Sequence, residues 1–341
     1  MSSVLSDAPP PGSASPVSGT VLEVRDLSVE YLLERGEVLA VDRVSFDLAA
    51  GEFLGIVGES GCGKSTLLFA IAQLLVPPAE VTGGSVIFKG RNMVGLTDKE
   101  MTAIRWRNLS VVMQSAMNAL NPVKSIGAQF SDAMRAHGVA SKGEIAERSA
   151  EVLKMVGIDP VHLKSYPHQL SGGMRQRSMI AMAMLFTPDL VIMDEPTSAL
   201  DVVAQRSLMV HIKKLQEELG FAVIFVTHDM SLVSHFSDRL MVMYGGVIAE
   251  FGATRHVFDT PLHPYSIGLL DAFPSIRGPR VPLTGIPGSP PNLANIPPGC
   301  RFAPRCPKVM ARCEVEPPEL YEVDGTLVRC FLHDGGGRAD D

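Results

Sequence analysis

The chain contains the glycine-rich stretch Gly58-Glu-Ser-Gly-Cys-Gly-Lys-Ser-Thr66. The apolar run Phe53 to Val57 precedes it and is typical of a buried strand, and the apolar run Leu67 to Leu75 follows with the length of a helix. A glycine-rich loop between a strand and a helix is the context of a phosphate-binding loop. The glycines bring backbone N–H groups close to an anion, and the helix N-terminus adds its positive dipole end. The stretch therefore predicts a nucleoside triphosphate site.

The side chains of this loop have separate expected roles. Lys64 is placed to reach the β- and γ-phosphates, and Ser65 offers a hydroxyl ligand to Mg²⁺. We expect the whole loop to surround the phosphates, that is, Gly58, Glu59, Ser60, Gly61, Cys62, Gly63, Lys64, Ser65 and Thr66. The loop by itself predicts triphosphate binding but does not indicate which process the energy of triphosphate hydrolysis drives.

Composition and charge exclude several classes of function. The chain has 341 residues, of which 46% are hydrophobic and 20% charged, as expected for a globular protein. The net charge of -7 disfavours nucleic-acid binding, because phosphate contacts need a basic face. No apolar run approaches the ~20 residues of a membrane helix, and no signal peptide is recognisable. We therefore expect a globular protein of the cytoplasm.

Predicted strands and helices alternate along most of the chain. Residues 1–20 are rich in Ser, Pro and Ala, and we expect a disordered leader there. Apolar runs and alternation predict strands at 21–29, 38–48, 53–57, 83–90, 109–113, 190–195, 221–226, 240–244 and 247–251. This order predicts an α/β fold with a largely parallel sheet and helices on both faces.

Two regions depart from this alternation. Residues 120–167 are predicted to form a mainly helical insertion, with helical periodicity over 126–157. From about Thr260 prolines accumulate and no long helix is predicted, and residues 335–341 have the composition of a loose tail.

Polar residues follow the predicted strand ends, where α/β sheets bind ligands. Asp194 is placed to hold the Mg²⁺ shell, and Glu195 to polarise the attacking water, although adjacent carboxylates can also be a surface pair. Gln114 is expected to orient the water or to ligate Mg²⁺. His228 is aimed at the γ-phosphate region by its place after a strand. Near the first strand end, Tyr31 is either a packing residue or a platform for a purine ring, and the pattern alone favours packing.

Further motifs indicate a family. The sequence Leu170-Ser-Gly-Gly173 lies between Gln114 and the Asp194-Glu195 pair, and Ser198-Ala-Leu-Asp201 and His228 follow. Over residues 21–274 this set resembles the nucleotide-binding subunit of an ABC transporter. The resemblance implies that Tyr31 stacks on adenine and that two subunits enclose two ATP molecules head to tail. It also implies that the signature acts on the ATP of the partner subunit through Ser171, Gly172 and Gly173.

The chain also resembles one branch of that family, the ATPases of oligopeptide and dipeptide (nickel) permeases. The resemblance rests on Leu120-Asn-Pro122, the sequence from Pro167 to Arg177, Met243-Tyr-Gly-Gly246, His263-Pro-Tyr265 and Gly299-Cys-Arg-Phe-Ala-Pro-Arg-Cys-Pro307. It implies a phosphate-loop ATPase domain over 21–273 with an antiparallel β subdomain and a helical subdomain that includes 120–167. A small Pro- and Cys-rich extension would then span 274–341. Ser198 departs from the Thr of many relatives but keeps the hydroxyl.

The resemblance also implies an activity and partners. The chain would hydrolyse ATP to drive import of oligopeptides or dipeptides, while nickel chelates and oligosaccharides stay open as solutes. Its partners would be a second ATPase subunit, with a paralogue favoured over a copy, two transmembrane permease subunits and an extracytoplasmic binding protein. It would lie at the cytoplasmic face of the membrane. A soluble ABC ATPase acting on DNA or ribosomes would predict a long coiled coil or a basic face, and a kinase would lack the signature.

Four of the five cysteines lie close together in the sequence, with five, six and sixteen residues between them. They contain no C-x-x-C pair, so a zinc ribbon fits poorly, and a reducing cytosol disfavours disulfides. Four thiolates can ligate a [4Fe–4S] cluster. The family resemblance implies such a cluster on Cys300, Cys306, Cys313 and Cys330, and unrelated buried cysteines remain the alternative.

Overall fold

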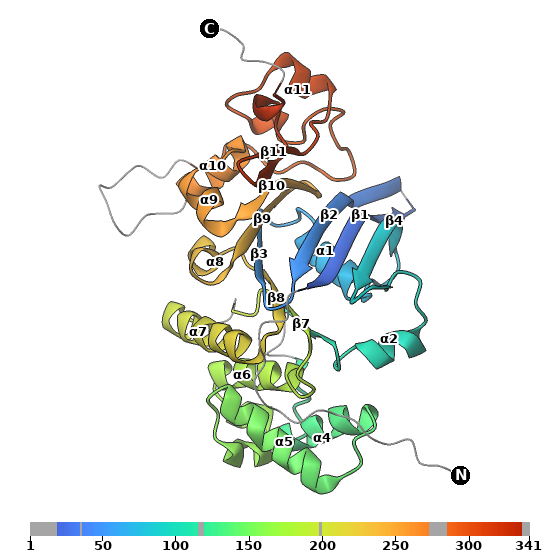
Figure 1. Ribbon diagram of the computed structural model, residues 1–341, viewed down its shortest axis with the longest axis vertical. Helices are drawn as coiled ribbons and strands as arrows, with labels where there is room; N and C mark the ends of the chain where they lie inside the picture. The colour runs from blue at the N-terminus through green and yellow to red at the C-terminus, as the bar shows by residue number, and fades with distance from the viewer. Residues whose placement is uncertain (1–18, 35, 115–118, 198–199, 273–284, 336–341) are drawn as a thin grey trace.

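The computed structural model describes residues 19–34, 36–114, 119–197, 200–272 and 285–335. Most of the predicted leader and tail, Ser198 and the predicted boundary at 273–274 lie outside these ranges. Two sheets organise the described residues, and a helical region and the C-terminal segment lie at opposite ends (Figure 1). None of the described helices is long and apolar enough to span a membrane.

The first sheet is antiparallel and has the strand order β2-β1-β4-β5. Its two long strands confirm the predicted pair near the N-terminus, although both extend further than the alternating pattern suggested. Buried and exposed residues alternate along much of β1, so one face of this sheet packs inward. The strands are β1 (Thr20–Leu33), β2 (Gly36–Ala49), β4 (Ala79–Phe88) and β5 (Arg91–Asn92).

The second sheet forms the centre of the molecule, with the order β11-β12-β10-β9-β3-β8-β7-β6. Five neighbouring strands are parallel: β3 (Phe53–Val57), β6 (Leu109–Val112), β7 (Leu190–Asp194), β8 (Ala222–Val226) and β9 (Arg239–Tyr244). Every residue of β3, β7 and β8 is buried, as expected for parallel strands covered on both faces. The predicted α/β sheet is therefore confirmed.

Three antiparallel strands extend this sheet beyond β9. β10 (Val247–Ala253) turns back on β9 through Gly245 and Gly246, which both have positive φ angles and confirm the predicted hairpin. β12 (Thr326–Val328) pairs with β10, and β11 (Tyr321–Val323) pairs with β12. The C-terminal segment, defined here as residues 285–335, thus contributes two strands to the main sheet that the sequence pattern did not predict.

The predicted helical insertion consists of several short elements rather than one continuous helix. Its elements are α4 (Ile126–Ala136), α5 (Lys142–Met155) and the 3-10 turns η1 (Pro160–Lys164) and η2 (Pro167–Gln169), and α6 (Gly172–Ala183) follows the insertion. Gly138, with a φ of 89°, lies between α4 and α5, and serine side chains cap both of these helices.

The other helices connect the strands or belong to the C-terminal part of the chain. In chain order they are α1 (Lys64–Ile71), α2 (Asp98–Ile104), α7 (Val202–Leu219), α8 (Met230–Phe236), α9 (Thr254–Asp259), α10 (Pro264–Asp271) and α11 (Ala311–Val315). Two 3-10 turns, η3 (Ala303–Arg305) and η4 (Phe331–His333), lie in the C-terminal segment.

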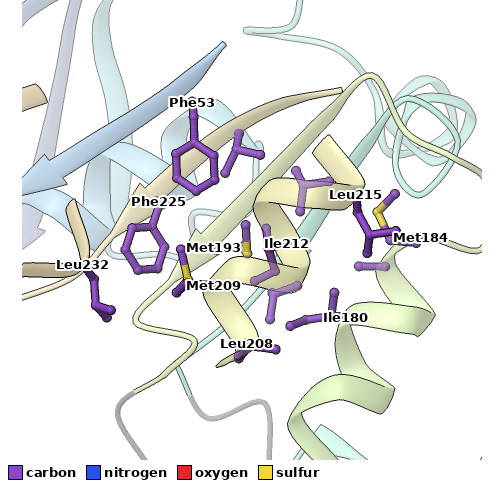
Figure 2. Packing of buried hydrophobic residues seen from close by; sticks show 14 of the residues in the cluster. Phe53, Ile180, Met184, Met193, Leu208, Met209, Ile212, Leu215, Phe225 and Leu232 are labelled. Carbon is purple, nitrogen blue, oxygen red and sulfur yellow. The ribbon is translucent and has the colours of Figure 1, made fainter. Parts of the chain in front are cut away.

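Alternate residues of the parallel strands belong to different apolar cores. On one face Phe53, Met193 and Phe225 pack against one side of α7, including Met209 and Ile212 (Figure 2). On the other face the cluster joins α1 to the antiparallel sheet, with Leu54, Ile56, Ile192, Ile224, Leu67, Leu68 and Val24. The strand ends that carry the predicted site are therefore held from both sides.

Candidate functional site

The phosphate-binding loop connects β3 to α1, as the sequence predicted. Gly58 and Gly63 have positive φ angles and lie against neighbouring backbone. A Cβ atom on Gly58 would lie 2.2 Å from the carbonyl oxygen of Met243, and one on Gly63 would lie 2.3 Å from that of Ala40. Glycine is therefore required at both positions for the loop to fit against the sheet.

Lys64 begins α1 and is 7% exposed. Its ammonium donates to the carbonyl oxygens of Gly58 at 2.8 Å and Glu59 at 2.9 Å. The loop thus wraps around its own lysine. A buried cation with backbone carbonyls as its acceptors is well placed to bind a phosphate group.

A cleft of about 280 Å³ lies at this loop, close to the lower end of the range of small-molecule sites. One wall is polar and comes from the loop, Gln114 and Glu195. The other wall is apolar and includes Tyr31, whose hydroxyl lies 3.2 Å from the Thr66 hydroxyl. The full lining is Tyr31, Val38, Ala40, Ser60, Gly61, Gly63, Lys64, Ser65, Thr66, Gln114, Glu195 and Leu293.

Asp194 ends β7 and is 3% exposed. Burial raises its pKa, while a hydrogen bond from the Ser65 hydroxyl acts in the opposite direction. Its Oδ1 atom has no hydrogen-bond partner among the described residues. A buried carboxylate oxygen without a partner is costly, and a hard cation with oxygen ligands would satisfy it. The donor set of Asp194 and Ser65 therefore fits Mg²⁺.

Glu195 has two polar neighbours from other strand ends. Gln114 donates from Nε2 to Oε2 of Glu195 at 2.8 Å, and His228 Nδ1 lies 3.5 Å from Oε1. Glu195 has a φ of 45°, in a region that costs a non-glycine residue about 1–3 kcal/mol, and its N–H donates to Val226 O at 2.9 Å. The structure brings these three predicted side chains together, and backbone strain at a carboxylate of this kind is typical of a functional site.

The signature residues lie away from the phosphate loop of the same chain. Ser171 caps α6 and accepts a hydrogen bond from Met174 N at 3.3 Å. Ser171 and Gly173 line a separate cavity with Arg177, and no phosphate-loop residue contributes to it. A Cβ on Gly173 would meet nothing within 4 Å, so packing among the described residues does not require glycine there. The open space suits a ligand from outside the chain.

The four C-terminal cysteines line a single cavity, together with Phe302, Phe331 and His263. All four are free thiols, and Cys300 N donates to Cys313 O at 2.7 Å. Even so, no group of three or more His, Cys, Asp or Glu side chains in the described ranges has the arrangement of a metal site. Cys62, the fifth cysteine, is buried beside Lys64, and burial raises its pKa.

Sequence reasoning missed several residues that contact the loop or its cleft, and three of them lie beyond residue 260. Arg305 pairs with the carboxylate of Glu59, Tyr265 accepts a hydrogen bond from Glu59 N at 2.9 Å, and Leu293 lines the cleft. Arg305 and Tyr265 lie inside motifs that the sequence analysis had quoted as typical of the peptide permease branch. Those motifs were the signal that could have located them.

Two family models cover most of this architecture. One is described as "ABC transporter" and matches residues 41–198, and the other as "Oligopeptide/dipeptide transporter, C-terminal region" and matches residues 249–313. A model of an AAA domain also matches residues 163–234, within the same nucleotide-binding core.

Relatives match over nearly the whole chain. The "Oligopeptide transport ATP-binding protein OppD" of Salmonella typhimurium is 42% identical over 97% of both chains. The "Dipeptide transport ATP-binding protein DppD" of Bacillus subtilis is 45% identical over 92% of this chain and 95% of its own. A solved structure, a dimer of the ATP-binding cassette MJ0796 bound to ADP and Pi, is similar with a TM-score of 0.62 and 30% identity. It covers 69% of this chain and 99% of that one.

The identity and coverage of these relatives show the family, and the site has the matching geometry: a phosphate loop, a buried aspartate and a glutamate held by Gln114 and His228. The chain therefore belongs to the ATP-hydrolysing ATP-binding subunits of ABC transporters, in the oligopeptide and dipeptide transport branch.

Proposed function

We propose that this chain drives the import of oligopeptides or dipeptides, with ATP binding closing a pair of ATPase subunits and hydrolysis reopening it. The observation that carries the proposal is the separation of two half-sites. The phosphate loop, Gln114 and Glu195 share one cleft, whereas the signature residues Ser171 and Gly173 line another cavity. Each half-site is incomplete without the other half from a second subunit.

Within the cleft we propose the following roles. Lys64 and the loop N–H groups bind the phosphates, and Ser65, Asp194 and the Gln114 amide oxygen would hold Mg²⁺, which neutralises phosphate charge when bound. Glu195 accepts a proton from the attacking water as general base. Gln114 and His228 support it, since each contacts one of its two carboxylate oxygens. Tyr31 stacks on the adenine from the apolar wall.

We propose that a membrane subunit docks beside Gln114. An apolar groove lies there, lined by Trp106, Met113, Met179 and Met182. Met113 is exposed and directly precedes Gln114. A helix of a permease subunit that inserts into this groove would contact Met113, next to Gln114. Because Gln114 binds the Glu195 carboxylate, this contact would link transport to hydrolysis. This role places the chain at the cytoplasmic face of the membrane, with two permease subunits, a paralogous ATPase and an extracytoplasmic binding protein.

We propose that the four cysteines hold a [4Fe–4S] cluster of structural function. The support is that four free thiols from residues 300–330 line one cavity with apolar walls. Their side chains would have to converge further than they do in the described structure to ligate a cluster. We assign the cluster to a C-terminal extension of residues 274–341 that follows an ATPase domain over residues 21–273, with a helical subdomain that includes 120–167.

Reconstitution tests the proposed transport. Liposomes that contain the chain, its partner ATPase and the two permeases, supplied with the binding protein, should take up a labelled tripeptide only with ATP and Mg²⁺ on the ATPase side. The same vesicles with Lys64→Ala should show no uptake. Uptake of a nickel chelate or an oligosaccharide with no uptake of peptides of two to five residues would contradict the proposed solute and leave the ATPase assignment standing.

A further inference from the structure

Arg305 of the C-terminal segment contacts the phosphate-binding loop directly, although 246 positions separate the two in the sequence. Its Nη1 donates to Glu59 Oε2 at 2.6 Å, and its Nη2 donates to Glu59 Oε1 at 3.0 Å. The Arg305 side chain is 6% exposed, so water hardly screens the pair. Two parallel hydrogen bonds between a guanidinium and a carboxylate fix orientation as well as distance.

The guanidinium is itself held in place by three neighbours. Its Nε donates to Pro287 O at 2.8 Å, Nη2 to Ile286 O at 3.3 Å, and Nη1 to the Tyr244 hydroxyl at 3.2 Å. The contact with Glu59 raises the pKa of Arg305, so the pair stays charged. The Arg305 side chain is thus fixed in one orientation and connects the C-terminal segment to the loop.

Glu59 contacts both Arg305 and Lys64, the lysine of the phosphate-binding loop. Its carboxylate is held by Arg305, its N–H donates to the Tyr265 hydroxyl at 2.9 Å, and its carbonyl oxygen accepts from Lys64 Nζ at 2.9 Å. The position of the Lys64 ammonium therefore depends on Glu59, which Arg305 of the C-terminal segment and Tyr265 of α10 hold in place.

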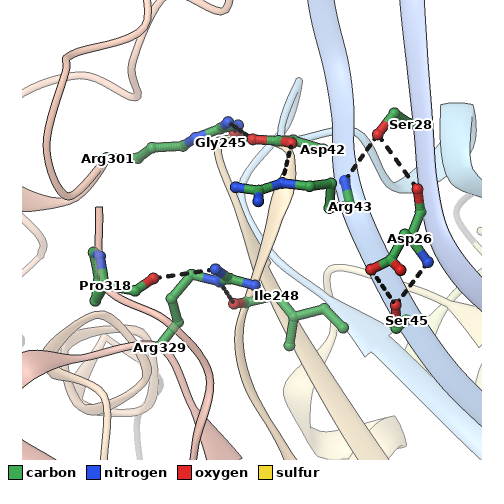
Figure 3. Close-up of polar contacts among 10 residues, drawn as sticks. All are labelled: Asp26, Ser28, Asp42, Arg43, Ser45, Gly245, Ile248, Arg301, Pro318 and Arg329. Atoms are coloured by element: carbon green, nitrogen blue, oxygen red, sulfur yellow. Dashed lines mark hydrogen bonds and ion pairs between the residues drawn. The ribbon is translucent and has the colours of Figure 1, made fainter. Parts of the chain in front are cut away.

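Other residues of the same segment surround the nucleotide cleft. Leu293 lines the cleft on the apolar wall that also includes Tyr31. Arg301 binds Gly245 O and the Asp42 carboxylate (Figure 3). Next to Gly245, Gly246 N donates to Cys62 O in the loop at 2.9 Å. The segment therefore meets the loop region at separate places and not through Arg305 alone.

We propose that the C-terminal segment is a working part of this chain's own ATP site, and that Arg305 is a positioning residue that holds the phosphate loop through Glu59. The inference rests on the proposed role of the loop as the ATP site.

Titration of the purified full-length chain with ATP and Mg²⁺ tests this proposal. Arg305→Gln and Glu59→Gln should each raise the Kd roughly tenfold, since each loses a charged hydrogen-bond pair at the loop. The double variant should bind no more weakly than either single variant, because residues that act as a unit are not additive. In the assembled complex KM for ATP should rise while kcat stays close to that of the wild type.

The matched control is Arg312→Gln in the same segment. Arg312 is 50% exposed and pairs with Glu316 and Asp334, without contact to the loop. Its variant should bind ATP as the wild type does. If Arg305 merely stabilised the segment, Arg312→Gln would share its effect, and the Arg305→Gln and Glu59→Gln effects would add.

Three outcomes overturn the proposal: unchanged ATP affinity in Arg305→Gln, additive effects in the double variant, or an equal loss in the control. If Arg305→Gln does not fold, the Kd of Glu59→Gln for ATP tests the proposal by itself, and a Kd equal to that of the wild type refutes it. Lys64→Ala keeps the two proposals apart. If Lys64→Ala binds ATP like the wild type, the loop assignment itself fails, whereas loss of binding there with normal binding in Arg305→Gln refutes only the positioning role.

Discussion

The nucleotide cleft gathers side chains from distant parts of the chain, whereas the four cysteines of the cysteine cavity lie within residues 300–330, and the two sites rest on different kinds of support. Asp194, Glu195 and Gln114 follow parallel strands whose residues are packed on both faces. The four cysteines lie on short turns, a five-residue helix and loops. In the cleft the polar groups already contact one another, whereas the thiols line a cavity without forming a ligating group within the described residues.

This difference indicates how each site depends on its ligand. A cleft supported by a sheet core keeps its geometry when ATP is absent, because packing fixes the strand ends. Short irregular elements lack that support, so a bound cluster would contribute to the shape of the cysteine segment itself. We therefore expect substitutions in the cleft to alter ATP binding or hydrolysis with little effect on folding. Substitutions of the cysteines should alter the folding of the C-terminal segment with little effect on ATP binding or hydrolysis.

The largest effect is expected from Glu195→Gln, which keeps the shape of the side chain and removes the base. ATP binding should be retained, the closed dimer should persist, and turnover in the assembled complex should fall roughly 10²-fold or more. Glu218→Gln, on the exposed side of α7, is the control and should hydrolyse ATP normally. Near-normal turnover of Glu195→Gln, measured with the partner's own site inactivated, would count against Glu195 as the base.

Replacement of one cavity cysteine tests the other side of the comparison. Wild type purified without oxygen should be brown and contain about four iron and four sulfide per chain. Cys313→Ser should lose the colour and make the C-terminal segment sensitive to proteolysis, while ATP still binds. Cys62→Ser, outside the cavity, should keep the iron. Colourless wild-type protein with stoichiometric zinc, from cells well supplied with iron, would replace the cluster with a zinc site.

A smaller effect is expected when the pH is lowered, which should reduce the free energy of unfolding through a histidine near the cysteine cavity. His263 caps α10, packs near Phe302 and lies on the cysteine cavity. Burial lowers its pKa to about 3 from an ordinary value of 6.5. Between these two values the unfolded chain binds more protons than the folded one, so stability is lost as the pH falls from about 6.5 towards 3. The slope is at most about 1.4 kcal/mol per pH unit.

Thermal unfolding of His263→Asn at several pH values measures this contribution. Asparagine can still cap the helix but does not titrate, so the variant should lose part of the acid sensitivity of the wild type. His256, at an exposed position of α9, offers the control substitution His256→Asn, which should keep the full sensitivity. Equal pH slopes in wild type and His263→Asn would contradict the assignment.

The same contrast explains what could be predicted from sequence. β3 was predicted residue for residue, because a buried parallel strand is a continuous apolar run. β7 ends at Asp194, one residue before the predicted end at Glu195. The helix after the loop begins at Lys64, earlier than its apolar run, since the loop lysine already has helical geometry. The continuous helical pattern of 126–157 hid the break at Gly138.

The C-terminal segment was less predictable for physical reasons. The strands β11 and β12 have three residues each, too few for alternation to be recognised. The accumulation of prolines gave no indication that the segment buries apolar side chains, yet Phe302 joins the main core and Phe331 is buried near the cysteines. The pairing of Arg305 with Glu59 depends on tertiary folding, and nothing local in the sequence indicates it.

The binding of ATP to Lys64→Ala is the most direct test of the central claim, that the loop at the end of β3 is the ATP site. The variant removes the one lysine that the loop surrounds and leaves the sheet intact. We predict that its Kd for ATP rises at least about tenfold, because the phosphates lose their nearest cation. Its iron content should equal that of the wild type. ATP binding by Lys64→Ala as tight as that of the wild type would contradict the account.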